Sequence, residues 1–94
     1  MPRQAAAEGR QTYLIEHYRP GSDVEELTRS VSRVREAVVE MEGMGKAVHY
    51  VRSTIVPADE SILCVFEAAS EELVREAYAR ARIPFERIST AIAE

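Results

Sequence analysis

The stretch AVHYVRSTIVPADESILCVFEA, residues 47–68, decides the fold of this chain. Residues 47–56 and 61–68 are both rich in β-branched and aromatic side chains, which favour β-strands. Between them, Pro57-Ala58-Asp59-Glu60 has the composition of a turn. Residues 47–68 therefore predict a β-hairpin.

The segments on either side of this hairpin complete the pattern. Residues 12–18 predict a strand that ends at Pro20-Gly21, and residues 22–43 predict a helix with a capping box at Ser22 and Glu25. Its apolar residues recur in helical steps, and they are Val24, Leu27, Val31, Val34, Val38 and Met41. Residues 70–82 predict a second helix capped by Ser70, and residues 87–92 a short final strand.

The resulting order, β-α-β-β-α-β, is the split βαβ pattern of the ferredoxin-like fold. We therefore expect an α+β domain in which two helices cover one face of a four-stranded antiparallel sheet. Residues 11–94 form this single domain in our interpretation. Residues 1–10 show no apolar periodicity and predict a flexible N-terminal arm.

Composition excludes several classes of protein. A chain of 94 residues buries a small share of its surface, which favours self-association. The net charge of −4 argues against a nucleic-acid-binding protein. The single cysteine, Cys64, fits a reducing, cytoplasmic setting, and no stretch approaches the ~18 apolar residues of a membrane span.

Two helices leave the second face of the sheet uncovered. A symmetric hairpin pairs Ile55 with Ile62, Ser53 with Cys64 and Val51 with Phe66 on one side, and Thr54 with Leu63, Arg52 with Val65 and Tyr50 with Glu67 on the other. We expect the first set to lie beneath the helices. In the first strand we expect Tyr13, Ile15 and His17 to face outward. The uncovered face would then carry an apolar patch of Tyr13, Ile15, Tyr50, Leu63 and Val65, which favours a homodimer packed sheet to sheet.

Metal binding is the first chemical hypothesis for this face. Imidazole and carboxylate groups, as in His17, His49 and Glu67, are ligands that transition metals accept. No two of them lie at the spacing of a local metal motif, so a site would be assembled across strands or between subunits. We expect His17 and Glu67 as the leading ligands and His49 as a further one. A slip of one residue in the hairpin register would bring His49 to the face of Glu67.

Three other interpretations stay open. Glu67, near Tyr50 and Arg52, predicts either an ion pair at an interface or the polar end of a pocket for a small molecule. In such a pocket Tyr13 and Tyr50 would stack on the ligand, and Arg52 would bind an anionic group. By analogy of fold alone, the chain is a candidate cofactor-free isomerase or oxygenase, and it is also a candidate for a structural or regulatory dimerisation module. Cys64 is expected to act as a small apolar residue of a central strand.

Four segments carry a resemblance to a known family: Tyr13–His17, Val48–Ser53, Leu63–Ala68 and Ile83–Ile88. Here the chain resembles small bacterial domains of unknown function that are commonly named nickel-binding proteins. The resemblance implies a ferredoxin-like fold, a dimer and a bound nickel ion. It also implies that His17 and His49 match metal-binding histidines and that Glu67 matches a family acid. Ile15 and Arg52 depart from the pattern, because the nickel-binding members can have an acid and a histidine there.

Overall fold

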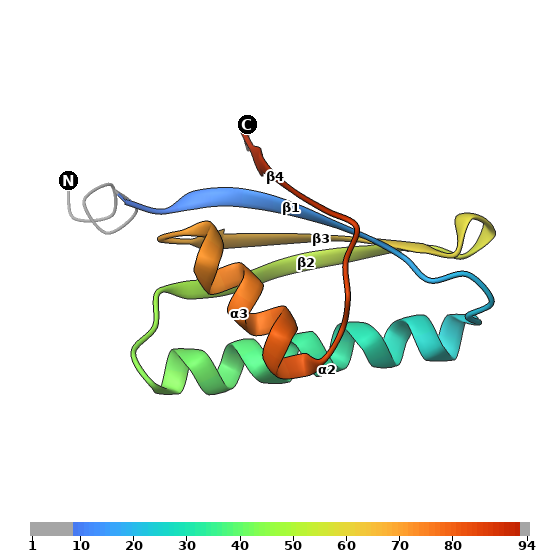
Figure 1. Ribbon diagram of the computed structural model, residues 1–94, viewed down its shortest axis with the longest axis horizontal. Helices are drawn as coiled ribbons and strands as arrows, with labels where there is room; N and C mark the ends of the chain where they lie inside the picture. Colours follow the sequence, from blue (N-terminus) through green and yellow to red (C-terminus); the bar gives the residue numbers. More distant parts are fainter. Residues whose placement is uncertain (1–8, 93–94) are drawn as a thin grey trace.

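The computed structural model describes residues 9–92, and these form one antiparallel sheet with two helices on the same side of it (Figure 1). The elements in chain order are β1 (Gln11–Tyr18), α2 (Val24–Gly43), β2 (Val48–Val56), a short 3₁₀ turn (Pro57–Asp59), β3 (Ser61–Ala68), α3 (Glu71–Ala81) and β4 (Arg87–Ala91). The strand order across the sheet is β2-β3-β1-β4. The ferredoxin-like α+β fold predicted from the sequence is confirmed.

The two central strands, β1 and β3, carry the core. Ile15 lies opposite Cys64 of β3 and Ile88 of β4, and Cys64 in turn lies opposite Ser53 of β2. Side chains that alternate along each strand point toward the helices, and Ile15, Ile62, Cys64 and Phe66 have no exposed surface. The predicted stripe of α2 is buried against them except at its first residue, Val24, which is 52 % exposed.

The expected orientation of β1 is wrong. Tyr13, Ile15 and His17 lie beneath the helices rather than on the uncovered face, with exposed fractions of 6, 0 and 1 %. The uncovered face receives Thr12, Leu14 and Glu16 instead. Both sets contain an apolar residue and a polar one, so alternation alone does not distinguish them. The larger set is inside because Tyr13 and Ile15 bury more apolar surface than Leu14 does.

The predicted hairpin register is correct from Arg52 to Val56 and wrong before that point. A β-bulge at Val51 inserts one residue into β2, so Tyr50 lies opposite Phe66 instead of Glu67, and His49 lies opposite Glu67. Tyr50 therefore faces the helices, where its ring meets Phe66 edge to face at a centroid distance of 5.7 Å. Aromatic packing of Tyr50 and burial of Val48, which is 1 % exposed, accompany this shift.

The N-cap of α2 lies one residue later in the chain than predicted. Asp23, not Ser22, is the N-cap: its carboxylate accepts a hydrogen bond from the Glu26 amide, and the Glu26 carboxylate accepts one from the Asp23 amide. Ser22-x-x-Glu25 and Asp23-x-x-Glu26 fit the same pattern in sequence. The Ser22 amide is used by a preceding turn, where it donates to the Arg19 carbonyl. The predicted Ser70 cap of α3 is confirmed.

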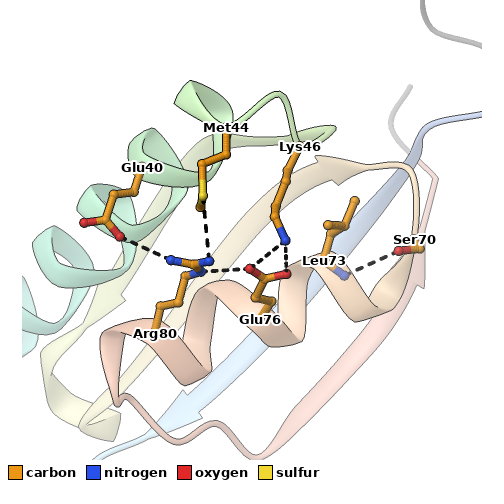
Figure 2. Close-up of polar contacts among 7 residues, drawn as sticks. All are labelled: Glu40, Met44, Lys46, Ser70, Leu73, Glu76 and Arg80. Atoms are coloured by element: carbon orange, nitrogen blue, oxygen red, sulfur yellow. Dashed lines mark hydrogen bonds and ion pairs between the residues drawn. The ribbon is translucent and has the colours of Figure 1, made fainter.

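The two helices are joined by an ion-pair cluster at the end of α2. Figure 2 shows Lys46 and Arg80 both directed at Glu76 of α3, with Nζ–O and Nε–O distances of 3.0 and 2.8 Å. Arg80 also reaches Glu40 of α2 at 3.5 Å. Hydrogen bonds from Lys46 and Arg80 hold the pKa of Glu76 below its usual range. The cluster is exposed to solvent, so it orients the helices more than it stabilises the fold.

Two further expectations concern the N-terminal residues and a membrane-spanning helix. Of the predicted flexible arm, residues 1–10, only Gly9 and Arg10 belong to the part that the structure describes. Neither α2 nor α3, the α-helices found within residues 9–92, is long and apolar enough to cross a membrane.

Truncating the central aromatic residue of the core should destabilise the fold strongly. Phe66 is fully buried between Tyr50 and Tyr78, so Phe66→Ala removes apolar contacts and leaves a cavity. We expect a loss of about 3–5 kcal/mol in the free energy of unfolding, measured by urea denaturation. The control is Val51→Ala on the uncovered side, which should cost less than about 1 kcal/mol. Equal losses for both variants would contradict the assigned orientation of β3.

Candidate functional site

The uncovered face of the sheet presents three rows of side chains, one behind the other. The register aligns His49, Glu67, Thr12 and Ala91 in the first row, Arg52, Val65, Leu14 and Ser89 in the second, and Thr54, Leu63, Glu16 and Arg87 in the third. Leu14, Leu63 and Val65 make its apolar centre and are only partly buried. Neighbouring strands place opposite side chains about 5 Å apart, so each row is a line of contacts. We call this surface the open face.

His49 stands at one corner of the open face, at the edge of the sheet. The bulge at Val51 places it opposite Glu67, and its Nδ1 lies 3.3 Å from the Glu42 carboxylate in the last turn of α2. All three side chains are exposed to solvent. Of these two carboxylates, only that of Glu42 is in contact with the imidazole. Imidazole and carboxylate groups are donor types that suit a divalent transition-metal ion.

His17 does not belong to this corner, because its side chain lies on the covered side of the sheet. Its Nε2 is 2.7 Å from the Tyr78 hydroxyl of α3, and its ring packs edge to face on Tyr78. Nδ1 is buried and has no hydrogen-bond partner within residues 9–92. Burial, with a smaller effect of the Arg19 charge, lowers the pKa of His17 from 6.5 to about 4. At neutral pH His17 is therefore an uncharged core residue.

A chain of polar side chains extends from His17 through the core. At its other end the Cys64 sulfur lies 2.9 Å from the Ser53 hydroxyl. The Tyr50 hydroxyl donates to Ser53 at 2.8 Å and ends the chain near the edge of the sheet. Burial raises the pKa of both the Cys64 thiol and the Tyr78 hydroxyl. These groups are consequently neutral, which argues against Cys64 as a nucleophile.

The structure divides the predicted site residues between two faces. Tyr13, His17 and Tyr50 lie on the covered side, while His49, Arg52 and Glu67 lie on the open face. Stacking of Tyr13 and Tyr50 on an open-face ligand is thus wrong: Tyr13 is 6 % exposed, and Tyr50 packs on Phe66. The joint site of His17, His49 and Glu67 is likewise not assembled within one chain. Glu42 was not predicted as a site residue, although it lies in the last turn of α2, a short loop before β2.

A hollow of about 220 Å³ lies in the open face. Leu14 and Val65 line it from the two central strands, and Arg52 and Glu67 line it with charged groups. Two of the predicted ligand-binding residues, Arg52 and Glu67, thus line the same hollow. A half-buried hollow with an apolar floor and a few polar groups is typical of a binding site.

The donors at the His49 corner fit a nickel ion in chemical type but not in number. Imidazole and carboxylate ligands suit nickel, which prefers four or six donors in tetragonal or octahedral geometry. Within residues 9–92 no group of three or more His, Cys, Asp or Glu side chains is arranged to hold a metal ion. His49 is in contact with Glu42, and Glu67 is the register partner of His49 on the next strand. The described residues of one chain thus bring one pair of candidate donors into contact.

One protein family and one solved structure match this chain. The family described as nickel responsive protein SCO4226-like matches residues 13–90. The crystal structure of SCO4226 from Streptomyces coelicolor A3(2) is similar at a TM-score of 0.70 and 21 % identity, covering 88 % of this chain and 98 % of that one. At that identity the structural match supports the fold alone. Among curated protein sequences, none matches the chain.

The buried histidine should make the stability of the fold depend on pH. The unfolded chain binds a proton at His17 below pH 6.5, whereas the folded chain does so only near pH 4. The free energy of unfolding therefore falls as the pH drops through this window, by about 3 kcal/mol. Urea denaturation between pH 7.5 and pH 4 measures the effect. His17→Gln should remove most of this slope and His49→Gln should keep it; an unchanged slope in His17→Gln would contradict the assignment.

Proposed function

Since this chain belongs to the SCO4226-like family of nickel-responsive proteins, we propose that it is a small metal-binding protein without enzymatic activity. We place it in the cytoplasm, where a single unpaired cysteine stays reduced. In this proposal nickel or a similar divalent ion binds at the His49 corner of the open face. The observation that supports it most is the bulge at Val51, which turns His49 toward the side of Glu67.

His49 and the two acids near it would be the protein ligands. The His49 imidazole supplies a nitrogen donor, and Glu42 and Glu67 supply carboxylate oxygens. The ion would be held by charge as well as by coordination, because two of the three proposed ligands are glutamates. His17 is not proposed as a ligand, since it is 1 % exposed and its Nε2 is bonded to Tyr78.

We further propose that the protein forms a homodimer through the open face. The half-buried centre of Leu14, Leu63 and Val65 is an apolar surface that a second copy can cover, and a small domain gains core by doing so. Two copies related by a twofold axis present the same residues to each other. Ligands from the second copy could then fill the coordination positions that one chain leaves to water.

Removal of the imidazole should weaken nickel binding. We expect His49→Ala to lower the affinity for Ni²⁺ by more than about tenfold, and Glu42→Gln to do so by roughly tenfold, as measured by isothermal titration calorimetry on tag-free protein. Glu25→Gln is the matched control, because Glu25 lies at the opposite end of the same helix and is exposed. Nickel binding that is equally strong in His49→Ala would refute this site.

A charge at the centre of the open face should prevent dimer formation. Val65→Arg places a cation in the middle of the apolar surface, and we expect the dimer to dissociate at least about a hundredfold more readily. Light scattering after size-exclusion chromatography measures the oligomeric state. Val39→Arg is the control, because Val39 is 67 % exposed on the outer side of α2. If Val39→Arg, and not Val65→Arg, gives monomers, the dimer uses the helical side.

A further inference from the structure

The hollow in the open face combines an apolar floor with two opposite charges. Leu14 and Val65, which are register partners on the central strands, form the floor, and Ala91 and Val51 lie on its sides. Arg52 lies opposite Val65, and Glu67 lies two residues further along β3 on the same face. Such diagonal neighbours are roughly 7–8 Å apart between their Cα atoms, so both charges can reach one small molecule.

Neither charge is paired within the part of the chain that the structure describes. Among residues 9–92, Arg52 and Glu67 take part in no ion pair, whereas Arg87 and Glu16 at the other end of the open face are paired at 2.9 Å. A guanidinium beside an apolar floor is suited to bind a carboxylate through two parallel hydrogen bonds. A carboxylate in the same hollow is suited to bind an ammonium group. The two charges are therefore arranged for an occupant that carries both.

We propose that this hollow binds a free α-amino acid with a small aliphatic side chain. Its carboxylate lies on Arg52, its ammonium group on Glu67, and its side chain on Leu14 and Val65. The volume of about 220 Å³ is below the roughly 300–1,000 Å³ of pockets for drug-sized ligands, which fits a molecule of this size. A simple carboxylic acid would leave Glu67 facing its alkyl chain, and a simple amine would leave Arg52 unpaired.

This site goes beyond metal binding and does not require a metal ion. Glu67 is shared between the hollow and the His49 corner, so nickel and the ammonium group would compete for it. The proposed dimer covers the same Leu14 and Val65, so a second copy and the amino acid would exclude each other at the hollow. Binding is therefore tested on protein freed of metal with a chelator, at a low and at a high protein concentration.

The experiment is a titration followed by amide chemical shifts in ¹H–¹⁵N spectra. The probe is L-leucine, compared with 4-methylpentanoate, which lacks the ammonium group, isoamylamine, which lacks the carboxylate, and glycine, which lacks the side chain. We expect leucine to shift the amides of Leu14, Val65 and Ala91, and each comparator to bind at least about tenfold more weakly. Arg52→Gln should weaken leucine binding about tenfold and leave isoamylamine unchanged.

Arg87→Gln is the matched control, because Arg87 lies on the same face but is paired with Glu16. It should bind leucine as the unmodified chain does. No shift at millimolar leucine, equal binding of all four probes, or equal losses in the two arginine variants would overturn the proposal. Shifts that follow protein concentration alone would assign the hollow to a second copy and also overturn it. Nickel binding to Arg52→Gln, measured separately, should be retained or strengthened, because Arg52 is not a proposed metal ligand and its charge opposes the cation. Loss of leucine binding with nickel binding retained therefore concerns the hollow alone.

Discussion

The β-bulge at Val51 determines which side chains of β2 lie on each face of the sheet. From Arg52 onward the strand follows a simple register with β3, with Ser53 opposite Cys64. Before the bulge the alternation is reset, so Tyr50 turns inward and His49 outward. The aromatic contact of Tyr50 with Phe66 and the exposure of His49 are two consequences of the same backbone irregularity. The core and the candidate metal corner therefore depend on one position.

The same reset brings a polar side chain into the core, and the core accommodates it by hydrogen bonding. Tyr50 donates to Ser53, whose hydroxyl lies 2.9 Å from the Cys64 sulfur, and Tyr78 pairs with His17. A buried polar group costs free energy unless it has a partner, and here only His17 Nδ1 lacks one within the described residues. The neutral state of His17 and of the Cys64 thiol follows from this environment. Both residues are explained as parts of the core without a role at the open face.

The sequence was sufficient for the fold but not for the faces of the strands. Apolar periodicity and turn residues define every helix and strand, because those signals are local. The face of β1 depends on which of two mixed sets, Tyr13-Ile15-His17 or Thr12-Leu14-Glu16, packs better under the helices, which is a tertiary property. The bulge has no signal in VHYVRS, since Val51 is a normal strand residue. For this reason His49 was predicted only as a conditional partner of Glu67, and Glu42 was not considered.

The charges of the open face are distributed unevenly between its two ends. At one end Glu16 and Arg87 neutralise each other within the chain. At the other end Arg52 and Glu67 border the hollow and form no ion pair within residues 9–92. A bare divalent cation at the His49 corner would be attracted by Glu67 and Glu42 and repelled by Arg52. The repulsion decreases when a carboxylate lies on Arg52, so an amino acid in the hollow compensates the one charge that opposes the metal ion, although both occupants draw on Glu67. Because Glu67 is shared, the amino acid and the metal ion compete, and the weaker repulsion by Arg52 only lessens this competition.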